Sequence, residues 1–305
     1  RRYSEPPLTA PRGENGAPVR RPATAEAAQL LADLVIANVR TVAFVRSRRA
    51  AESVSLGARR ALEESVPELV ERVAAYRAGY LAEDRRDLER ALHDGELLGL
   101  ASTNALELGV DISGLDAVLI AGWPGTHASL WQQAGRAGRD GRDALAVLIA
   151  RDDPLDTYLV HHPEAIFGRP VEAAVLDPDN PHVLAPHLAA AAAELPLTDA
   201  DLDTFGPSAA GVVDALVARG LLRQRPAGWY WTSRDRATDL ADLRGTGGAP
   251  VRICESGTGR LLGTVDAATS HVMVHPGAVY LHQGATYVVS ELDLDDSIAL
   301  VADRK

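Results

Sequence analysis

Lysine is almost absent from this chain: of its 31 basic residues, only Lys305 is a lysine. A phosphate-binding P-loop ends in Lys-Ser or Lys-Thr, so that motif cannot occur here. The Asp-Glu pair that holds magnesium beside many such loops is also missing from the sequence. The chain by itself therefore lacks the residues that bind and hydrolyse a nucleoside triphosphate, and we expect it to hold no cofactor tightly.

Cysteine is equally scarce. Cys254 has no partner for a disulfide and cannot form a zinc site of four thiolates, so we expect a reducing, cytoplasmic environment. No apolar run has the roughly 20 residues of a membrane-spanning helix, and the first five residues lack the apolar core of a signal peptide, so no membrane partner is expected. The absence of a Gly-x-Ser-x-Gly elbow argues against serine hydrolase chemistry.

The charge of the chain is acidic but uneven. A formal net charge of −11 disfavours a protein that coats nucleic acid non-specifically, because phosphate contacts need cations. Residues 1–60 nevertheless carry 11 arginines against 5 acids, whereas residues 191–305 carry 10 basic residues against 15 acids. A nucleic-acid track is therefore expected to favour the first part of the chain, with a few focused patches elsewhere.

Short apolar segments alternate with amphipathic stretches between residues 25 and 165. We expect strands at 41–45, 73–76, 97–101, 117–121 and 144–150, with helices between them. Wholly apolar strands that alternate with helices are typical of a parallel sheet covered on both faces. The sequence therefore predicts an α/β domain over 25–165, preceded by an extended entry segment over 1–24.

The rest of the chain changes character twice. Residues 166–197 are rich in proline and alanine and predict a connector with one helix. Residues 198–247 follow the order helix, helix, two-stranded hairpin, which is typical of a winged-helix domain. In residues 248–305, β-branched runs interrupted by glycine predict a small β-barrel, with one of its strands at 271–274.

Three histidines near Cys254 raise the question of a metal site. His271 and His275 have the spacing of ligands on a helix, but the predicted strand at 271–274 does not suit that spacing. We therefore expect no metal site in this domain. In the hairpin before it, we expect Trp229 and Trp231 to pack into the core and Tyr230 to point outward.

The most informative stretch runs from Gln132 to Arg139, with the sequence Gln-Gln-Ala-Gly-Arg-Ala-Gly-Arg. On one helix, Arg136 and Arg139 would project from the same face, and their guanidinium groups can bind phosphate oxygens bidentately. Gln132, one helical turn earlier, can add a neutral hydrogen bond. A solvated, arginine-rich helix end is the alternative interpretation, and this stretch alone leaves both open.

Other stretches precede it in a fixed order. Residues 101–112 (Ala-Ser-Thr-Asn-Ala-Leu-Glu-Leu-Gly-Val-Asp-Ile) follow a predicted strand, at the edge where α/β sheets bind ligands. Residues 41–52 hold a short strand followed by Arg-Ser-Arg, and residues 76–80 read Tyr-Arg-Ala-Gly-Tyr. Taken in order with 132–139, they resemble motif IV, the block after it, motif V and motif VI of superfamily 2 helicases.

The resemblance narrows to the SftH/MrfA (YprA-like) family of bacterial helicases. Stretches similar to that family run through nearly the whole chain: Glu5–Leu8, Gly16–Arg20, Leu148–Asp156, Phe167–Glu172 and His275–Gly284. The resemblance implies the second RecA-like lobe of an ATP-driven DNA translocase with 3′-to-5′ polarity and a role in DNA repair. Members also carry a four-cysteine metal site, which this chain lacks.

The resemblance also implies roles for individual residues. Arg136 and Arg139, supported by Gln132, would be catalytic arginine fingers that stabilise charge during phosphoryl transfer. Gly109 and Asp111 would approach the nucleotide. DNA-backbone contacts would come from a larger set: Arg46, Ser47, Arg48, Ser102 and Thr103 in the lobe, and Arg223 and Arg225 in the winged-helix hairpin. Ser47 also fits a helix N-cap, and both roles can hold at once.

Three functions are compatible with these observations. In the first, the chain works with a first RecA-like lobe of the same polypeptide, which supplies the P-loop, and ATP and Mg²⁺ bind only in the complete enzyme on DNA. In the second, the chain is a stand-alone, non-catalytic nucleic-acid-binding module. In the third, it is a nucleotide-binding scaffold that recruits a partner. The arginine pair favours the first, because a motor without turnover has no use for arginine fingers.

Overall fold

A computed structural model describes residues 21–109, 112, 115–138, 143–240 and 249–304. Its contacts divide the chain into two units. One unit contains Arg1–Glu172 together with Ala249–Lys305, and the other contains Ala173–Gly248. Residues 1–24 were expected to be an extended entry segment, and the first 20 of these lie outside the described residues.

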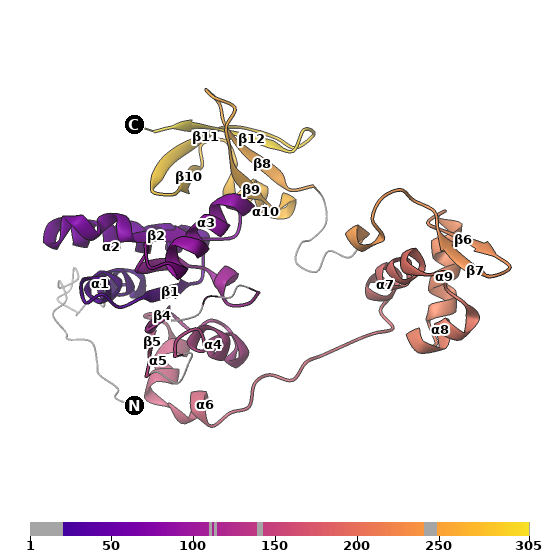
Figure 1. Cartoon of the computed structure of the whole chain (residues 1–305), viewed down its shortest axis with the longest axis horizontal. Helices are drawn as coiled ribbons and strands as arrows, with labels where there is room; N and C mark the ends of the chain where they lie inside the picture. Colours follow the sequence, from indigo (N-terminus) through magenta and orange to yellow (C-terminus); the bar gives the residue numbers. More distant parts are fainter. Residues whose placement is uncertain (1–20, 110–111, 113–114, 139–142, 241–248, 305) are drawn as a thin grey trace. The chain divides into compact units, whose positions relative to one another are not determined.

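The first unit is built on a parallel five-stranded sheet (Figure 1). The strand order is β2-β3-β1-β4-β5, and every pairing is parallel. The strands are β1 (Thr41–Val45), β2 (Val73–Tyr76), β3 (Gly99–Ser102), β4 (Ala117–Ala121) and β5 (Leu145–Ile149). The sheet therefore confirms the expected RecA-like α/β architecture, and parallel pairing brings all five carboxyl ends to one edge.

Alternate side chains of these strands serve two different cores. In β1, Ala43 and Val45 join the core under α1 (Ala23–Ile36) and α2 (Arg48–Ser65). Val42 and Phe44 join the core on the other face. That second core is covered by four helices: α3 (Ala82–His93), α4 (His127–Ala134), α5 (Pro154–His161) and α6 (Glu164–Phe167). Burial on both faces explains why the inner strands β1, β3 and β4 are largely apolar, whereas the edge strand β5 is partly exposed.

The described residues of this lobe include two short 3₁₀ turns. The first, η1 (Pro67–Arg72), leads into β2, and the second, η2 (Asn104–Leu106), follows β3 directly. The Thr103 hydroxyl accepts a hydrogen bond from the amide of Ala105 and so caps η2. This cap orients the loop at the carboxyl edge of the sheet.

The C-terminal part of the first unit is a second, curled five-stranded sheet that resembles half of a small barrel. Its order is β10-β11-β12-β8-β9, and only β12 with β8 is parallel. The elements are β8 (Val251–Glu255), β9 (Leu261–Val265), α10 (Ala267–Met273), β10 (Val279–His282), β11 (Ala285–Asp293) and β12 (Ile298–Asp303).

The strand predicted at 271–274 is wrong. The segment is the end of the helix α10, followed by Val274. Ser270 and Val274, four residues apart, are fully buried, whereas Val272 is 78% exposed. Burial at a spacing of four is helical, so the β-branched residues in this stretch misled the prediction.

The second unit has winged-helix architecture. It contains α7 (Pro181–Glu194), α8 (Asp199–Phe205), α9 (Ala209–Ala218), β6 (Leu222–Arg225), β7 (Gly228–Trp231) and η4 (Ala237–Leu240). The sequence places the start of this domain at 198, whereas the contacts start it at Ala173. The reason is that α7, expected in the connector, contributes Leu184 and Leu188 to the domain core.

Within the first unit, the half-barrel sheet contacts the RecA-like lobe at the Tyr-Arg-Ala-Gly-Tyr block. The Arg77 guanidinium donates to the Tyr280 hydroxyl at 3.1 Å and to the Leu281 carbonyl at 2.7 Å. The amide of Thr264 donates to the Gly79 carbonyl at 3.0 Å. The block after motif IV therefore binds the C-terminal sheet.

Candidate functional site

A hollow of about 260 Å³ lies at the carboxyl edge of the parallel sheet. Its lining comes from the ends of β1 and β4, from the loop after β3, and from α4. Polar members of the lining are Arg46, Asn104, Glu107, Ser129 and Gln133. The structure thus brings the stretches that resemble motifs IV, V and VI together around one hollow.

Glu107 is the centre of the contacts in this site. Its carboxylate accepts hydrogen bonds from the Ser129 hydroxyl at 2.6 Å and from the Gln133 amide nitrogen at 2.9 Å. Its backbone carbonyl accepts from Nε of Arg136 at 3.0 Å and also from Nη2. Glu107 therefore fixes the loop after β3 to both α4 and the segment that follows it.

Three of these four side chains are buried. Glu107, Gln133 and Arg136 are 8%, 5% and 7% exposed. The Gln133 side-chain oxygen is buried and has no hydrogen-bond partner among the described residues. A buried acceptor without a partner is rare in a folded protein and leaves a place for a donor from a ligand or a water.

Arg136 does not lie on the helix on which it was expected. The helix α4 ends at Ala134, Gly135 is its C-cap, and Arg136 follows in the next turn. Gly135 keeps a right-handed conformation, and the amide of Arg136 donates to the Gln133 carbonyl at 3.1 Å, so the chain leaves the helix through a tighter turn. Arg139, the other member of the expected same-face pair, lies outside the described residues.

The remaining nucleotide-site predictions concern Gln132, Gly109 and Asp111. Gln132 is exposed on α4, while its neighbour Gln133 makes the buried contact. Gly109 is exposed, has φ of 78°, and has no atom within 4 Å of where a Cβ would be. Asp111 lies outside the described residues. The backbone at Gly109 is therefore open, and its approach to a nucleotide stays a prediction.

The residues after β1 have three different environments. Arg46 is exposed and lines the hollow. The Ser47 hydroxyl accepts from the amide of Ala50 at 3.1 Å, which confirms the N-cap of α2. Arg48 is half-buried and lies 3.7 Å from the Asp266 carboxylate, and burial lowers its pKa, with the positive charge of Arg77 adding to that effect. Arg48 thus points toward the half-barrel sheet.

At the end of β3, Ser102 and Thr103 are more buried than we expect of residues that contact DNA. The Ser102 side chain is fully buried, and its hydroxyl donates to the Thr103 carbonyl at 2.8 Å. Thr103 is 6% exposed and is engaged in capping η2. In this conformation both hydroxyls shape the loop, and neither faces solvent freely.

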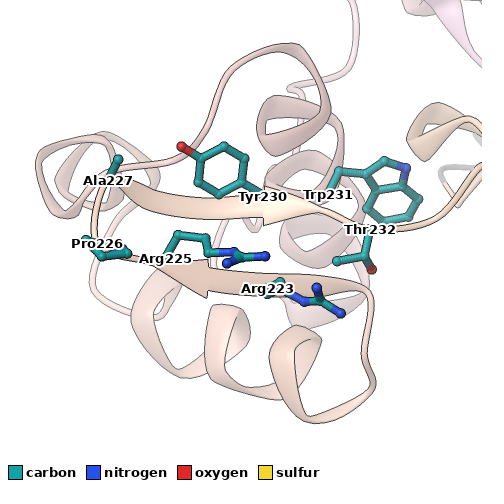
Figure 2. A pocket seen from close by; sticks show the side chains of 7 residues that line it. All are labelled: Arg223, Arg225, Pro226, Ala227, Tyr230, Trp231 and Thr232. Carbon is teal, nitrogen blue, oxygen red and sulfur yellow. The ribbon is translucent and has the colours of Figure 1, made fainter.

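In the other unit, Arg223 and Arg225 lie exposed on β6 of the winged-helix hairpin. They line an open hollow of about 630 Å³ together with Tyr230, Trp231 and Thr232 (Figure 2). Trp229 is buried and Trp231 packs against the core, whereas Tyr230 is exposed, so the expected arrangement of these aromatics is confirmed.

Sequence reasoning missed Glu107, Ser129 and Gln133 as site residues. One signal was available: Glu107 is the only charged residue between the predicted strand at 97–101 and Gly109. Among the described residues, no group of three potential metal ligands occurs. In the same part of the chain, every helix is too short or too polar to cross a bilayer.

Known protein families match both units. The helicase conserved C-terminal domain family matches residues 26–141, and the winged helix domain of the ATP-dependent helicase HRQ1 matches residues 176–246. The chain is 36% identical, over 93% of its length, to the uncharacterized ATP-dependent helicase YprA of Bacillus subtilis. It is 35% identical, over 90% of its length, to the ATP-dependent helicase HRQ1 of Saccharomyces cerevisiae.

A solved structure is similar over both units. The DUF1998 helicase MrfA, crystallised with DNA and AMPPNP, matches 97% of this chain with a TM-score of 0.79 and 35% identity. The chain spans 38% of YprA, 26% of HRQ1 and 41% of the MrfA chain. The chain matches the helicase conserved C-terminal domain and the winged helix domain of HRQ1, and it is similar over nearly its whole length to parts of YprA and MrfA. The chain therefore belongs to the superfamily 2 helicases, as a C-terminal part of such a protein.

Proposed function

We propose that this chain is the second motor lobe, with accessory domains, of an ATP-dependent DNA helicase or translocase. The observation that carries the proposal is the junction at the carboxyl edge of the sheet, where Arg136 of the motif VI stretch is bonded to Glu107 of the motif V stretch. This junction joins the loop before Gly109 to the segment that carries Arg136, and a preorganised cation beside a nucleotide would stabilise charge during phosphoryl transfer. Two relatives, YprA and HRQ1, are named as ATP-dependent helicases, which supports the same activity.

Hydrolysis would take place between this lobe and a first RecA-like lobe of the same polypeptide. ATP would supply the phosphoryl group and the free energy for movement. Arg136 and Arg139 would stabilise negative charge on the transferred group, with Gln132 beside them. Arg136 is 7% exposed and donates to the Glu107 carbonyl in this conformation, so it would reach the transferred group only after a rearrangement. Gly109 would allow the nucleotide a close approach, with Asp111 near it. We place the Mg²⁺ ligands on the first lobe, since the described residues offer no cluster for them.

DNA would follow the exposed cations of the lobe. Arg46 is free to meet a backbone phosphate beside the N-terminus of α2, where Ser47 and the first amides also favour an anion. Arg48, Ser102 and Thr103 would reach a phosphate only after rearrangement, since their present contacts are inside the protein. Arg223 and Arg225 would add a second contact in the other unit. The 3′-to-5′ polarity and the repair role are the finer parts of the proposal and rest on the family resemblance.

The test is ATP hydrolysis, with and without single-stranded DNA, by this chain alone and by a polypeptide that joins it to a first RecA-like lobe. We expect no turnover by the chain alone and DNA-stimulated turnover by the joined protein. Replacing Arg139→Ala should abolish most of that turnover. DNA binding by the joined protein without any turnover would instead support the non-catalytic binding module.

A further inference from the structure

The winged-helix hairpin presents one aromatic ring and two cations on a single face. In its register, Arg223 pairs with Tyr230 and Arg225 pairs with Gly228. Directly paired residues and residues two apart share a face of a β-ladder, so Arg223, Arg225 and Tyr230 lie together. Figure 2 shows these three side chains around the hollow of about 630 Å³.

Side chains on the opposite face of the hairpin pack into the core of the domain. Trp229 is 8% exposed and Leu222 is 2% exposed. Trp231 packs against the same core and is partly buried, and it also contributes to the lining of the hollow. The indole nitrogen of Trp231 donates to the Asp235 carbonyl at 3.1 Å. Tyr230, 37% exposed, is therefore not needed to fill the core, and its ring remains available to a ligand.

The hairpin is held rigidly on its domain. Leu197 and Trp229 exchange two backbone hydrogen bonds, of 3.0 and 2.8 Å. A Cβ on Gly228 would lie 2.1 Å from the Leu197 carbonyl oxygen, so the backbones touch at this point. A rigid site loses little conformational freedom when a ligand binds, which favours affinity.

The local charge is opposite to that of the chain. Residues 215–234 contain four arginines and no acidic residue, although the whole chain has a net charge of −11. A stretch of positive charge around an exposed aromatic ring suits a polyanion whose units carry flat, stackable groups. Single-stranded nucleic acid combines both properties, because phosphates alternate with bases.

We propose that this hairpin is a binding site for single-stranded DNA, in which an unpaired base stacks on Tyr230 while Arg223 and Arg225 bind the flanking phosphates. The proposal rests on the proposed function for the class of ligand, and it assigns the strand state and the stacking residue. A base-paired strand hides the faces of its bases, so only unpaired DNA can use the ring. Each stacked base and each neutralised phosphate contributes separately to affinity.

The test measures binding of this chain to a fluorescently labelled thymidine oligonucleotide of about 12 nucleotides, within the range of single-strand site sizes. Tyr230→Ala should weaken binding roughly fivefold or more, with the salt dependence unchanged. Arg225→Ala should weaken binding and reduce the slope of log K against log salt by about 0.7, the value for one lost phosphate contact. Tyr230→Trp should retain affinity, because it restores a stacking surface.

Two controls make the result specific. Arg219→Ala removes an exposed arginine of the same unit that does not line the hollow, and it should leave the Tyr230 effect unchanged. An oligonucleotide with abasic positions should bind the unsubstituted chain as weakly as the normal oligonucleotide binds Tyr230→Ala. Binding to a blunt duplex should not respond to Tyr230→Ala.

The inference is overturned if Tyr230→Ala binds single strands as tightly as the unsubstituted chain, or if it weakens duplex and single-strand binding equally. A circular-dichroism melting curve confirms that the variant is folded, since Tyr230 lies outside the core. Failure here would leave DNA-stimulated ATP hydrolysis in the joined protein unaffected, so it is distinguishable from failure of the proposed function. A loss of that hydrolysis with intact Tyr230-dependent binding would contradict only the motor assignment.

Discussion

The guanidinium of Arg77 lies 2.9 Å from the carboxylate of Glu52, and both side chains are 2% exposed. The same carboxylate accepts from the Tyr80 hydroxyl at 2.5 Å, and Arg77 also donates to Tyr280 and to the Leu281 carbonyl. A buried ion pair of this kind costs desolvation, which its additional hydrogen bonds offset. It fixes the half-barrel sheet on the RecA-like lobe, so we expect the two to unfold together.

Removing Arg77 should therefore be strongly destabilising. Arg77→Ala leaves the Glu52 carboxylate buried without its partner, and we expect a loss of about 3–5 kcal/mol in the free energy of unfolding. Urea denaturation of the chain measures it. Arg59→Ala is the matched control, because the pair Arg59–Glu71 has a largely exposed carboxylate and should contribute about 1 kcal/mol or less. Equal effects of the two substitutions would show that the buried network does not hold the sheets together.

The backbone contact beside that network makes a second prediction. A Cβ on Gly263 would lie 2.1 Å from the Gly79 carbonyl oxygen, and backbone cannot move aside cheaply. We expect Gly263→Ala to destabilise the chain by about 1–3 kcal/mol or more, as overpacking does. Gly257→Ala, where nothing lies within 4 Å of the new Cβ, should change stability by less than about 0.5 kcal/mol. Thermal melting of the two variants, each compared with the unsubstituted chain, measures these changes in stability, and equal changes would contradict the prediction.

His127, at the start of α4, predicts a dependence on pH. Its Nε2 lies 2.8 Å from the Ala165 carbonyl oxygen and its Nδ1 lies 3.0 Å from the Glu172 carboxylate. Two acceptors favour the doubly protonated ring, so the bond to Ala165 and then the bond to Glu172 raise the pKa of His127 above its ordinary value of 6.5. This contribution to stability is present below pH 6.5 and is lost as the pH rises through the folded-state pKa.

An NMR titration of the His127 ring protons measures that pKa. We expect a midpoint above 6.5 in the unsubstituted chain and a lower midpoint in Glu172→Gln, which keeps the shape of the side chain but removes its charge. In the unsubstituted chain, the amide of His127 also donates to Glu172, which is the main reason that the pKa of this carboxyl falls to about 2. A midpoint at or below 6.5 in the unsubstituted chain would contradict the assigned pair of hydrogen bonds.

Substitutions on the two faces of the winged-helix hairpin should change the free energy of unfolding to very different extents. Trp229→Ala removes a large buried ring, and we expect it to cost about 3–5 kcal/mol of unfolding free energy. Tyr230→Ala removes an exposed ring and should change stability by less than about 0.5 kcal/mol. Urea denaturation followed by far-ultraviolet circular dichroism separates the two. Comparable losses would mean that Tyr230 belongs to the core.

Much of the lobe could be predicted from the sequence because its strands are apolar on both faces. β1 and β4 were predicted with the bounds that the structure gives them, since each is a continuous apolar run. The segment 271–274 was predicted wrongly, because β-branched residues outweighed a helical spacing of the buried positions. The same-face argument for Arg136 and Arg139 was wrong in assuming that the helix continues past Gly135, since α4 ends at Ala134.

The contacts between distant segments could not be predicted from the sequence. Arg77 and Tyr280 are 203 residues apart, and no local pattern says that they meet. Glu107 illustrates the same difficulty within the site. Its charge in the loop was visible, but its three partners come from α4 and the turn after it, whose position depends on the packing of the whole lobe.

The measurement that tests the central claim most directly is the DNA-stimulated kcat for ATP hydrolysis of the joined protein carrying Arg136→Ala. If Arg136 stabilises charge in the transition state, kcat should fall by about a thousandfold while the KM for ATP changes little. Arg219→Ala, an exposed arginine of the other unit, should leave kcat unchanged. A kcat for Arg136→Ala within twofold of the unsubstituted protein would contradict the assignment of this lobe to the motor.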